Sequence, residues 1–466
     1  MEIITYDNWS TQIHLLSTPC TVIFVGVFSY FDRFGETKTE VVILILVALS
    51  LNFGFGILIP FMPIYAENLG ASITMIGVIV AAFTAGRAVA ANYAGDYSDR
   101  IGRKRVMTFG TALYGIATGL MAFVPSWQSL FFLRIVEGAS VGIVQPTAQA
   151  YIVDVVPKDK VGEASGLYST TFSVGFFIGP ILGSVSYWTS QQFGLSDANA
   201  LRSIFLVTAF FAFVGYLIVQ MRIEDFDPEY YENIQKELDK LTPQKEEINA
   251  VKPDLNSEYN KYYFTSFLMG VGIGFIIPIF TLYYIDVFGA TATLAGIIVG
   301  VSGGINAVIS VPAGYWGDRY GRKGIMLFAF PIMVLATAIL GLAPTIYVAV
   351  ILLFLRSIGQ SMFIPNFRGL QADVVLAKER GKVFGRTQTA FNFGAVMGPI
   401  VGAYLYDIMK GRVFEIAGFK FVGEGVPFVL TAIFQFSLLY FVLKFYYPVR
   451  SSLTVTSTVG IPVFAE

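Results

Sequence analysis

Segments of about twenty mostly apolar residues recur along the whole chain, and this pattern constrains the fold more than any other feature. A helix needs about 20 such residues to cross the hydrocarbon core of a bilayer. Six segments lie in the first half, at 41–64, 73–94, 106–124, 130–153, 164–188 and 204–221. Six more lie in the second half, at 262–285, 293–315, 325–343, 346–370, 383–406 and 428–445. The sequence therefore predicts an all-α membrane protein with twelve transmembrane helices.

The low content of ionisable residues supports the same prediction. Hydrophobic residues make up 55% of the 466-residue chain and charged residues only 14%, against about a quarter in an ordinary soluble domain. This composition excludes a cytosolic enzyme. The chain has 31 Lys and Arg residues and 32 Asp and Glu residues, so it has no overall positive charge to attract nucleic acid, which excludes a free nucleic-acid binder. The single Cys20 and the single His14 exclude a disulfide framework, a Cys-based zinc site and His-dependent catalytic dyads. We therefore expect no metal and no cofactor.

The second half of the chain repeats the first, with matching residues 219 positions apart, as Asp99 and Asp318 are. The same offset relates Pro180 to Pro399, and it is kept over most of each half. The repeat predicts two pseudo-symmetric six-helix bundles, at 41–221 and 261–447. We expect a charged central loop at 222–260, an N-terminal extension of unassigned role at 1–40 and a tail at 448–466.

The distribution of positive charge predicts the orientation in the membrane, because Lys and Arg are retained on the cytoplasmic side. Most basic loop residues follow the second, fourth, eighth and tenth segments, namely Arg100, Arg103, Lys104, Arg105, Lys158, Lys160, Arg319, Arg322, Lys323, Lys378, Arg380, Lys382 and Arg386. The opposite loops hold chiefly Arg202, Lys410, Arg412 and Lys420. We therefore expect a multi-pass protein of the cell membrane with the central loop and both termini in the cytoplasm.

The loops at 95–105 and 314–323 carry the same pattern of glycines, an acid and bases. The pattern resembles the signature loop of the major facilitator superfamily, G-x-x-x-D-R/K-x-G-R/K-R/K, and the resemblance extends over 41–445. In that family the acid and the arginines are thought to form a cytoplasmic latch that stabilises the outward-open state. The resemblance implies latch residues Gly95, Asp99, Arg100, Gly102, Arg103 and Asp154 in the first half, and Gly314, Asp318, Arg319, Gly321, Arg322 and Asp373 in the second. The alternative is a pair of basic loops that serve topology alone.

A second repeated motif places glycines around a proline in the segments 164–188 and 383–406. Its residues are Gly175, Gly179, Pro180 and Gly183 in the first copy, and Gly394, Gly398, Pro399 and Gly402 in the second. Small residues four apart let helices pack closely, and an interior proline bends a helix. The first copy resembles the antiporter motif of drug/proton exchangers, although Ser184 replaces a glycine there. A purely structural hinge is the alternative.

Arg134 and Glu137 lie within a predicted membrane segment, where ionisable residues are costly and often functional. Three residues apart, they share one helix face and can neutralise each other. The run resembles the family motif R-x-x-Q-G, whose Arg is associated with proton transfer, with Glu137 in place of the usual Gln. A buried carboxyl can take up and release protons, so we predict that this pair couples transport to protons. A static ion pair is the alternative.

Polar residues inside other segments are candidates for a central cavity. We expect Asn52, Gln145, Arg356, Gln360 and Asn392 to line it. Arg87 and Arg356 are each suited to attract an anionic substrate group, although Arg87 can also extend to an interface. Aromatic residues that suit a greasy solute are Phe53, Phe275, Tyr283, Tyr284, Phe363 and Phe391.

The chain has no G-x-x-x-x-G-K-S/T phosphate loop, so ATP is not expected to drive it directly, and no hydrolase nucleophile elbow, so we expect no enzyme. The resemblance implies a secondary transporter of a small organic solute that works by alternating access. We favour proton-coupled efflux by exchange; the alternatives are proton-coupled uptake, facilitated diffusion and a non-transporting membrane sensor. The expected partners are the solute, protons and membrane lipid, with no nucleic acid, and we expect a monomer.

Overall fold

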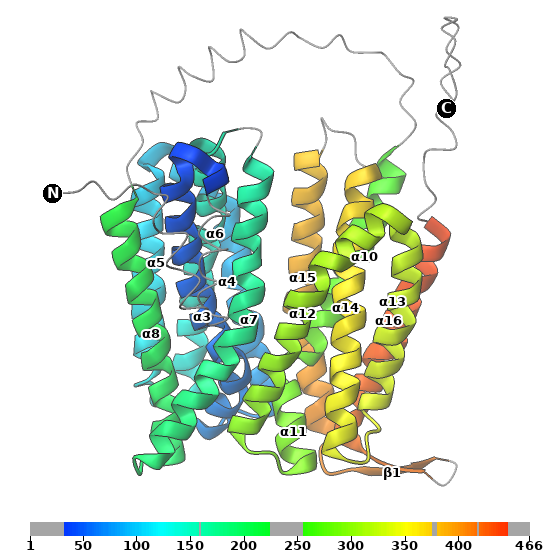
Figure 1. The fold of residues 1–466 in the computed structure, drawn as a ribbon. Coiled ribbons are helices and arrows are strands. Elements are labelled where there is room, and N and C mark those ends of the chain that lie inside the picture. The colour runs from blue at the N-terminus through cyan, green and yellow to red at the C-terminus, as the bar shows by residue number, and fades with distance from the viewer. Residues whose placement is uncertain (1–31, 158–159, 224–254, 375–379, 417–418, 446–466) are drawn as a thin grey trace, which may run out of the picture.

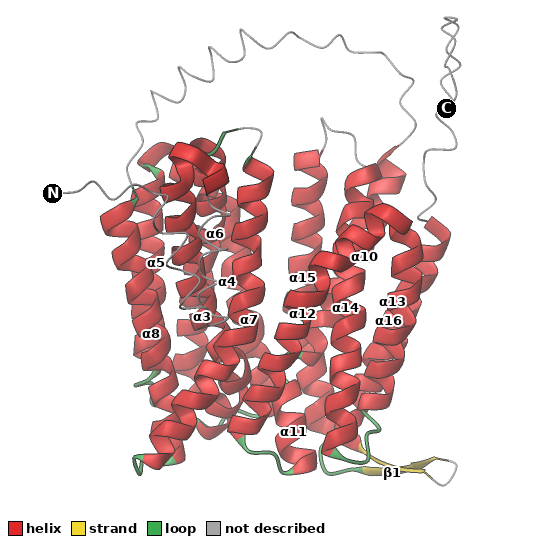
Figure 2. Ribbon diagram, viewed as in Figure 1, coloured by secondary structure: helices red, strands yellow, loops and turns green. Residues whose placement is uncertain are grey.

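The computed structural model describes residues 32–157, 160–223, 255–374, 380–416 and 419–445, and these are almost entirely helical (Figures 1 and 2). After the short 3-10 helix η3 (Asp32–Thr37), the first half contains α3 (Lys38–Asn68), α4 (Ile73–Ile101), α5 (Arg103–Met121), α6 (Trp127–Val155), α7 (Val161–Gln192) and α8 (Asp197–Arg222). The second half contains α10 (Leu255–Ile276), α11 (Phe280–Phe288), α12 (Ala292–Tyr320), α13 (Arg322–Leu340), α14 (Ile346–Val374), α15 (Arg380–Met409), β1 (Val413–Ile416), β2 (Phe419–Val422), η5 (Gly423–Gly425) and α16 (Val426–Phe445).

The predicted fold class is confirmed in the part of the chain that the structure describes. Nine helical segments there are long and apolar enough to cross a membrane, and α5, α15 and α16 complete the predicted twelve. Two features differ from the prediction. The helix expected at 262–285 is interrupted between α10 and α11, where Pro278 cannot donate a backbone hydrogen bond. The antiparallel hairpin of β1 and β2 was not predicted.

The helices form two bundles that stand side by side (Figure 1). In the first, called the N-half, α3 packs on α7 and α8, and α6 packs on α4 and α5. In the second, called the C-half, α10 packs on α15 and α16, and α14 packs on α12 and α13. The two halves meet through α4 against α15 and α7 against α12.

Two glycines make the tight turns at one end of the molecule. Gly102 separates α4 from α5 and Gly321 separates α12 from α13, with φ angles of 104° and 93°. Side chains other than glycine rarely adopt such angles, so each signature loop needs its glycine here. We call this end, which carries Gly102 and Gly321, the basic end, and the opposite end, which carries β1 and β2, the hairpin end.

The glycines of the second repeated motif bring helices of the same half into backbone contact. A Cβ atom on Gly175 would lie 2.6 Å from the backbone oxygen of Asn52 in α3, and one on Gly179 would lie 2.7 Å from Cα of Gly56. In the C-half, a Cβ on Gly402 would lie 2.0 Å from the backbone oxygen of Phe275 in α10. The motif therefore fixes α7 against α3 and α15 against α10, as small residues do inside membranes. Gly394 and Gly398 make similar contacts with the backbone of Phe267 and Val271, and Gly183 packs against the ring of Phe61.

Candidate functional site

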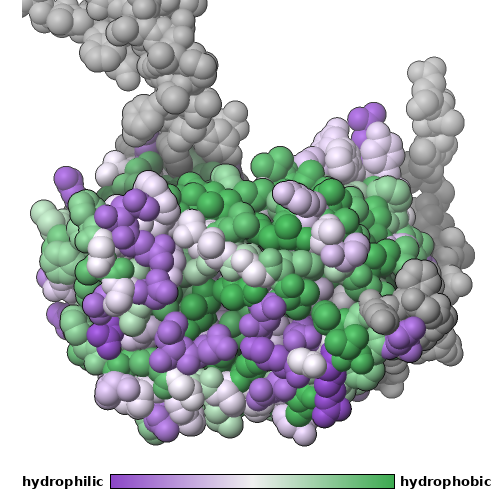
Figure 3. Space-filling model, turned by 90° about the horizontal axis from the view of Figure 1, so that it is seen from below, coloured by the Kyte–Doolittle hydropathy of each residue, from purple (hydrophilic) through white to green (hydrophobic). Residues whose placement is uncertain are grey.

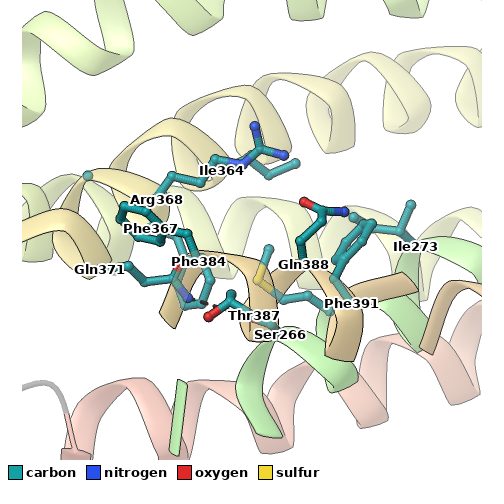
Figure 4. Close-up of a pocket in the computed structure, with 12 residues that line it drawn as sticks. Ser266, Ile273, Ile364, Phe367, Arg368, Gln371, Phe384, Thr387, Gln388 and Phe391 are labelled. Atoms are coloured by element: carbon teal, nitrogen blue, oxygen red, sulfur yellow. Dashed lines mark hydrogen bonds between the residues drawn. The ribbon is translucent and has the colours of Figure 1, made fainter. Parts of the chain in front are cut away.

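A cavity of about 590 Å3 lies between the two halves. Its wall is formed by residues of α3, α4, α6 and α7 in the N-half and of α10, α14 and α15 in the C-half. A second pocket of about 500 Å3 adjoins it among α10, α14 and α15, and the two share Ile273, Arg368, Gln388 and Phe391. Figure 4 shows this second pocket, with Arg368 from α14 on one side and Gln388 and Phe391 from α15 on the other. A solute of drug size would fit within this space.

The two halves touch toward the hairpin end. A Cβ on Gly77 of α4 would lie 2.4 Å from the backbone oxygen of Pro399 in α15. Between α12 and α7, a Cβ on Gly303 would lie 2.4 Å from the backbone oxygen of Phe176 at mid-helix, and Gly296, nearer the hairpin end, lies against Ser184. Seen from this end, the surface of the molecule shows no opening (Figure 3). The hairpin end of the cavity is therefore closed.

The same four helices separate toward the basic end. A Cβ atom would have no neighbour within 4 Å on Gly95 of α4, Gly166 of α7, Gly314 of α12 or Gly385 of α15. These glycines lie near the ends of the helices that form the contact between the halves at the hairpin end. The helices of the two halves therefore lie in close contact toward the hairpin end and part toward the basic end (Figure 1).

Polar contacts between the halves add to the closure at the hairpin end. Asp407 of α15 accepts hydrogen bonds from the backbone amide of Thr74, at 3.1 Å, and from its hydroxyl, at 2.6 Å. Lys410 Nζ lies 3.8 Å from Glu67 of the N-half and 2.8 Å from Asp286 of the C-half. Burial lowers the pKa of Lys410, but its hydrogen bond to Asp286 and the nearby carboxylates outweigh this and raise the pKa above the ordinary lysine value. Lys410 is thus charged at physiological pH.

We predict that Lys410→Met weakens the closure at the hairpin end. The pair with Glu67 is half-exposed, so its loss should shift the balance between closed and open hairpin ends only about two- to fivefold. Spin labels at the exposed Asn68 and Val413, in a Cys20→Ser background, would report the distance across this end. Arg412→Met is the matched control, and identical distance distributions in both variants would contradict the prediction.

At the basic end, each signature loop forms an ionic cluster within its own half. Arg103 of α5 contacts Asp99 and Ser98 of α4, and its Nε lies 3.0 Å from Oδ2 of Asp154 in α6. These contacts join α4, α5 and α6. Arg322 lies 2.8 Å from Asp318. A Cβ on residue 369 would meet the Arg322 guanidinium, so Gly369 makes room for it on α14. The side chain of Asp373 lies outside the described residues, and Arg100 and Arg319 are exposed.

The candidate coupling pair lies at the wall of the cavity. Arg134 Nη1 donates to Glu137 Oε2 at 2.5 Å, and the two residues are 5% and 0% exposed. Arg134 lines the cavity and its guanidinium lies 4.5 Å from the centre of the Phe83 ring. Glu137 lies behind it, near Tyr114 and Thr118 of α5. Arg134 thus separates the carboxyl from the cavity.

The surroundings of this pair have spare hydrogen-bonding capacity. Glu137 Oε1, Arg134 Nε, Tyr114 OH and Thr118 Oγ1 are buried and make no hydrogen bond of good geometry among the described residues, although Thr118 lies near both Glu137 and Tyr114. Buried polar atoms are normally paired, so unpaired ones in a group point to a proton or a water molecule that they can accept. The cluster is therefore suited to a change in its protonation state.

Three of the five polar residues expected at the cavity line it, namely Gln145, Gln360 and Asn392. Asn52 lies beside its wall, where its amide donates to Thr171 of α7 at 2.9 Å. Arg356 is buried, with its guanidinium 6.0 Å from the centre of the Phe280 ring, and it does not line the cavity. These two expectations differ from the structure because the sequence does not fix the rotation of each helix.

The aromatic lining also differs from the expectation. Of the six aromatic residues named from the sequence, only Phe391 lines the cavity, and the N-half supplies Phe55, Phe83, Phe172 and Phe176 instead. The repeat could have indicated one of these, because Phe172 lies 219 positions before Phe391.

Arg368 was not named from the sequence at all, although it lines both pockets. The repeat relates it to Gln149, which also lines the cavity. A polar residue at the same repeat position in both halves was therefore the signal for it.

Comparison with known proteins agrees with this architecture. A family model described as Major Facilitator Superfamily matches residues 42–252 and 262–460. The chain is 31% identical over 361 residues to the multi-drug resistance efflux pump PmrA of Streptococcus pneumoniae, covering 74% of this chain and 84% of that one. It is 29% identical over 409 residues to the multidrug resistance protein MdtG of Proteus mirabilis, covering 84% and 92%.

Solved structures show the same fold. A bacterial homologue of the human lysosomal transporter Spinster, in an inward-facing and occupied conformation, superposes with a TM-score of 0.71 at 13% identity, covering 88% of this chain and 97% of that one. A D-xylose-proton symporter gives a TM-score of 0.67 at 16% identity, covering 88% and 98%. Fold, cavity and relatives define a multi-pass membrane transporter of small molecules. The chain belongs to the major facilitator superfamily.

Proposed function

We propose that this protein is a proton-coupled exporter of small organic solutes. The observation that carries the proposal is the cavity between the halves, closed at the hairpin end, with the buried Arg134–Glu137 pair in its wall. The names of the relatives, a multi-drug efflux pump and a multidrug resistance protein, support export as the direction. One chain completes the cavity, which supports a monomer as the working unit.

The proposed orientation places the basic end in the cytoplasm. The two signature loops concentrate Arg and Lys at this end, as the positive-inside rule requires of cytoplasmic loops. In this orientation the described conformation receives solute from the cytoplasm of the cell. Rocking of the two halves would then close the basic end, open the hairpin end and release the solute outside.

The proposed coupling step is proton transfer to and from Glu137. A carboxylate this deeply buried is stable only while Arg134 compensates its charge, because breaking a buried pair costs about 3–5 kcal/mol. Protonation removes the charge and releases Arg134 toward the cavity. The charge that a solute meets in the cavity then depends on the protonation state of Glu137, which is the requirement for coupling.

Co-transport of solute and proton is the second candidate, and the position of Arg134 favours it. An anionic solute that paired with Arg134 would displace Glu137, and the freed carboxyl would then take up a proton. Solute and proton would move together rather than in exchange. The relative direction of the two fluxes separates the candidates.

Inside-out membrane vesicles from cells that produce the protein test the proposal. With the vesicle lumen acidic, we expect at least one solute of a labelled panel of drugs, organic acids and amino acids to accumulate, and a protonophore to abolish the accumulation. Vesicles without the protein give the background. Accumulation that persists in the presence of the protonophore would contradict proton coupling. Loss of trapped solute when the lumen is acidified would instead support co-transport.

A further inference from the structure

We infer that the cavity selects organic anions with an apolar body, a substrate class that rests on the proposed transport function. Three arginines line the cavity, namely Arg87, Arg134 and Arg368. No Asp or Glu is among the described residues that line it or the adjoining pocket. Because Glu137 neutralises Arg134, the net positive charge of the cavity comes from Arg87 and Arg368.

These two arginines lie on opposite walls, Arg87 on α4 of the N-half and Arg368 on α14 of the C-half. Neither has a carboxylate partner within the described ranges. A guanidinium group without a carboxylate partner is stabilised by a bound anion, and its planar fork matches a carboxylate, sulfonate or phosphonate. A cationic solute would meet like charge from both walls.

The two arginines lie at different depths. Arg87 is about four helical turns from the basic-end terminus of α4, whereas Arg368 is only about two turns from that of α14. Arg368 is also exposed, whereas Arg87 is only partly exposed. Arg368 is therefore placed to attract an anion at the mouth, and Arg87 to hold it deeper in the cavity.

An aromatic surface lies beside Arg87. The ring centres of Phe55 and Phe83 are 5.0 Å apart and stacked, and those of Phe172 and Phe176 are 4.6 Å apart. Phe55 also contacts Phe176, at 5.4 Å, so the four rings form one continuous patch. Such a patch binds the apolar body of a ligand while a charged group at its edge fixes the orientation. Amides that line the same cavity can donate to the anionic group or to other polar groups, and these are Gln145, Gln149, Gln360, Gln388 and Asn392.

Three probes of the same size and different charge test the inference, namely 2-naphthoate, 2-naphthalenemethanol and 2-naphthylmethylammonium. Their binding to the purified full-length protein is measured by isothermal titration calorimetry in detergent, with no gradient present. We expect 2-naphthoate to bind at least about tenfold more tightly than the ammonium probe. An ammonium probe that binds as tightly as 2-naphthoate, or no binding of 2-naphthoate at millimolar concentration, would overturn the inference.

Variants assign the selectivity to the arginines. We expect Arg87→Gln to weaken 2-naphthoate binding about tenfold and to leave the neutral alcohol within about twofold, because only the anion contacts the charge. Arg368→Gln should mainly slow association and reduce its dependence on salt. Arg87→Lys keeps the charge and should keep the preference for the anion, and Arg202→Gln, at an exposed arginine outside the cavity, is the control. Equal weakening of all three probes by Arg87→Gln would show a structural role and overturn the assignment.

The binding assay tests the inferred substrate class and the vesicle assay tests the proposed export, so either one can fail while the other succeeds. Selective binding of 2-naphthoate without any gradient-driven accumulation would leave the inference standing and refute the proposed export. Proton-driven accumulation of cations, with no binding of 2-naphthoate, would support the export and refute the inferred substrate class.

Discussion

Replacing Glu137 by glutamine is expected to abolish solute-dependent proton movement while leaving solute exchange intact. The amide cannot gain or lose a proton, so the coupled proton flux should fall at least about tenfold. A change of this size corresponds to a typical coupling free energy between two sites. Counterflow of labelled against unlabelled solute needs only the rocking of the two halves and should stay within about twofold of the wild type. Both fluxes can be measured in liposomes that contain the purified variant.

Glu163→Gln serves as the matched control, because Glu163 lies in the first turn of α7 and does not line the cavity. An unchanged pH dependence in the Glu137 variant would remove this carboxyl from the coupling role and leave a static ion pair. Loss of counterflow together with proton flux would show that the pair supports the fold rather than the coupling.

Gly179→Ala is expected to lower the stability of the N-half markedly. The new methyl group would lie 2.7 Å from Gly56 of α3, where only backbone atoms are available to move. Forcing extra volume into such a contact costs about 1–3 kcal/mol, and the separation of α3 from α7 would add to this. The apparent melting temperature of the purified protein should therefore fall by several degrees.

Gly166→Ala on the same helix is the matched control. A Cβ at residue 166 would have no neighbour within 4 Å, so this change should leave the melting temperature the same or slightly higher. Equal effects of the two substitutions would contradict the packing role of the glycine motif. The comparison separates the loss of a close helix contact from the general effect of alanine in a helix.

Much of the fold could be predicted because each membrane-spanning helix must be apolar over about 20 residues and because the chain repeats itself. The apolar runs and the offset that relates Asp99 to Asp318 identified twelve helices in two bundles. The interruption before α11 and the β1–β2 hairpin depend on a few local residues, such as Pro278, and apolar length gives no signal for either.

The site was harder to predict because a membrane helix is apolar on both its lipid face and its packed face. The sequence therefore gave no signal for the rotation of α3 and α14, and Asn52 and Arg356 were expected in the cavity although neither lines it. Polar residues that are costly inside a membrane gave a better signal, as Gln145 and Arg134 show. Asp407, which binds Thr74 across the two halves, has Trp188 as its repeat counterpart, so the repeat gave no indication of it.

The central claim is that solute transport by this protein is coupled to protons, and proton movement in liposomes tests it most directly. The purified protein is reconstituted with a pH-sensitive dye in the lumen, and solutes that bind the protein are added one at a time. The account predicts a solute-dependent proton flux opposite in direction to the solute flux, which Glu137→Gln eliminates. Transport of a labelled solute with no accompanying proton movement would contradict it.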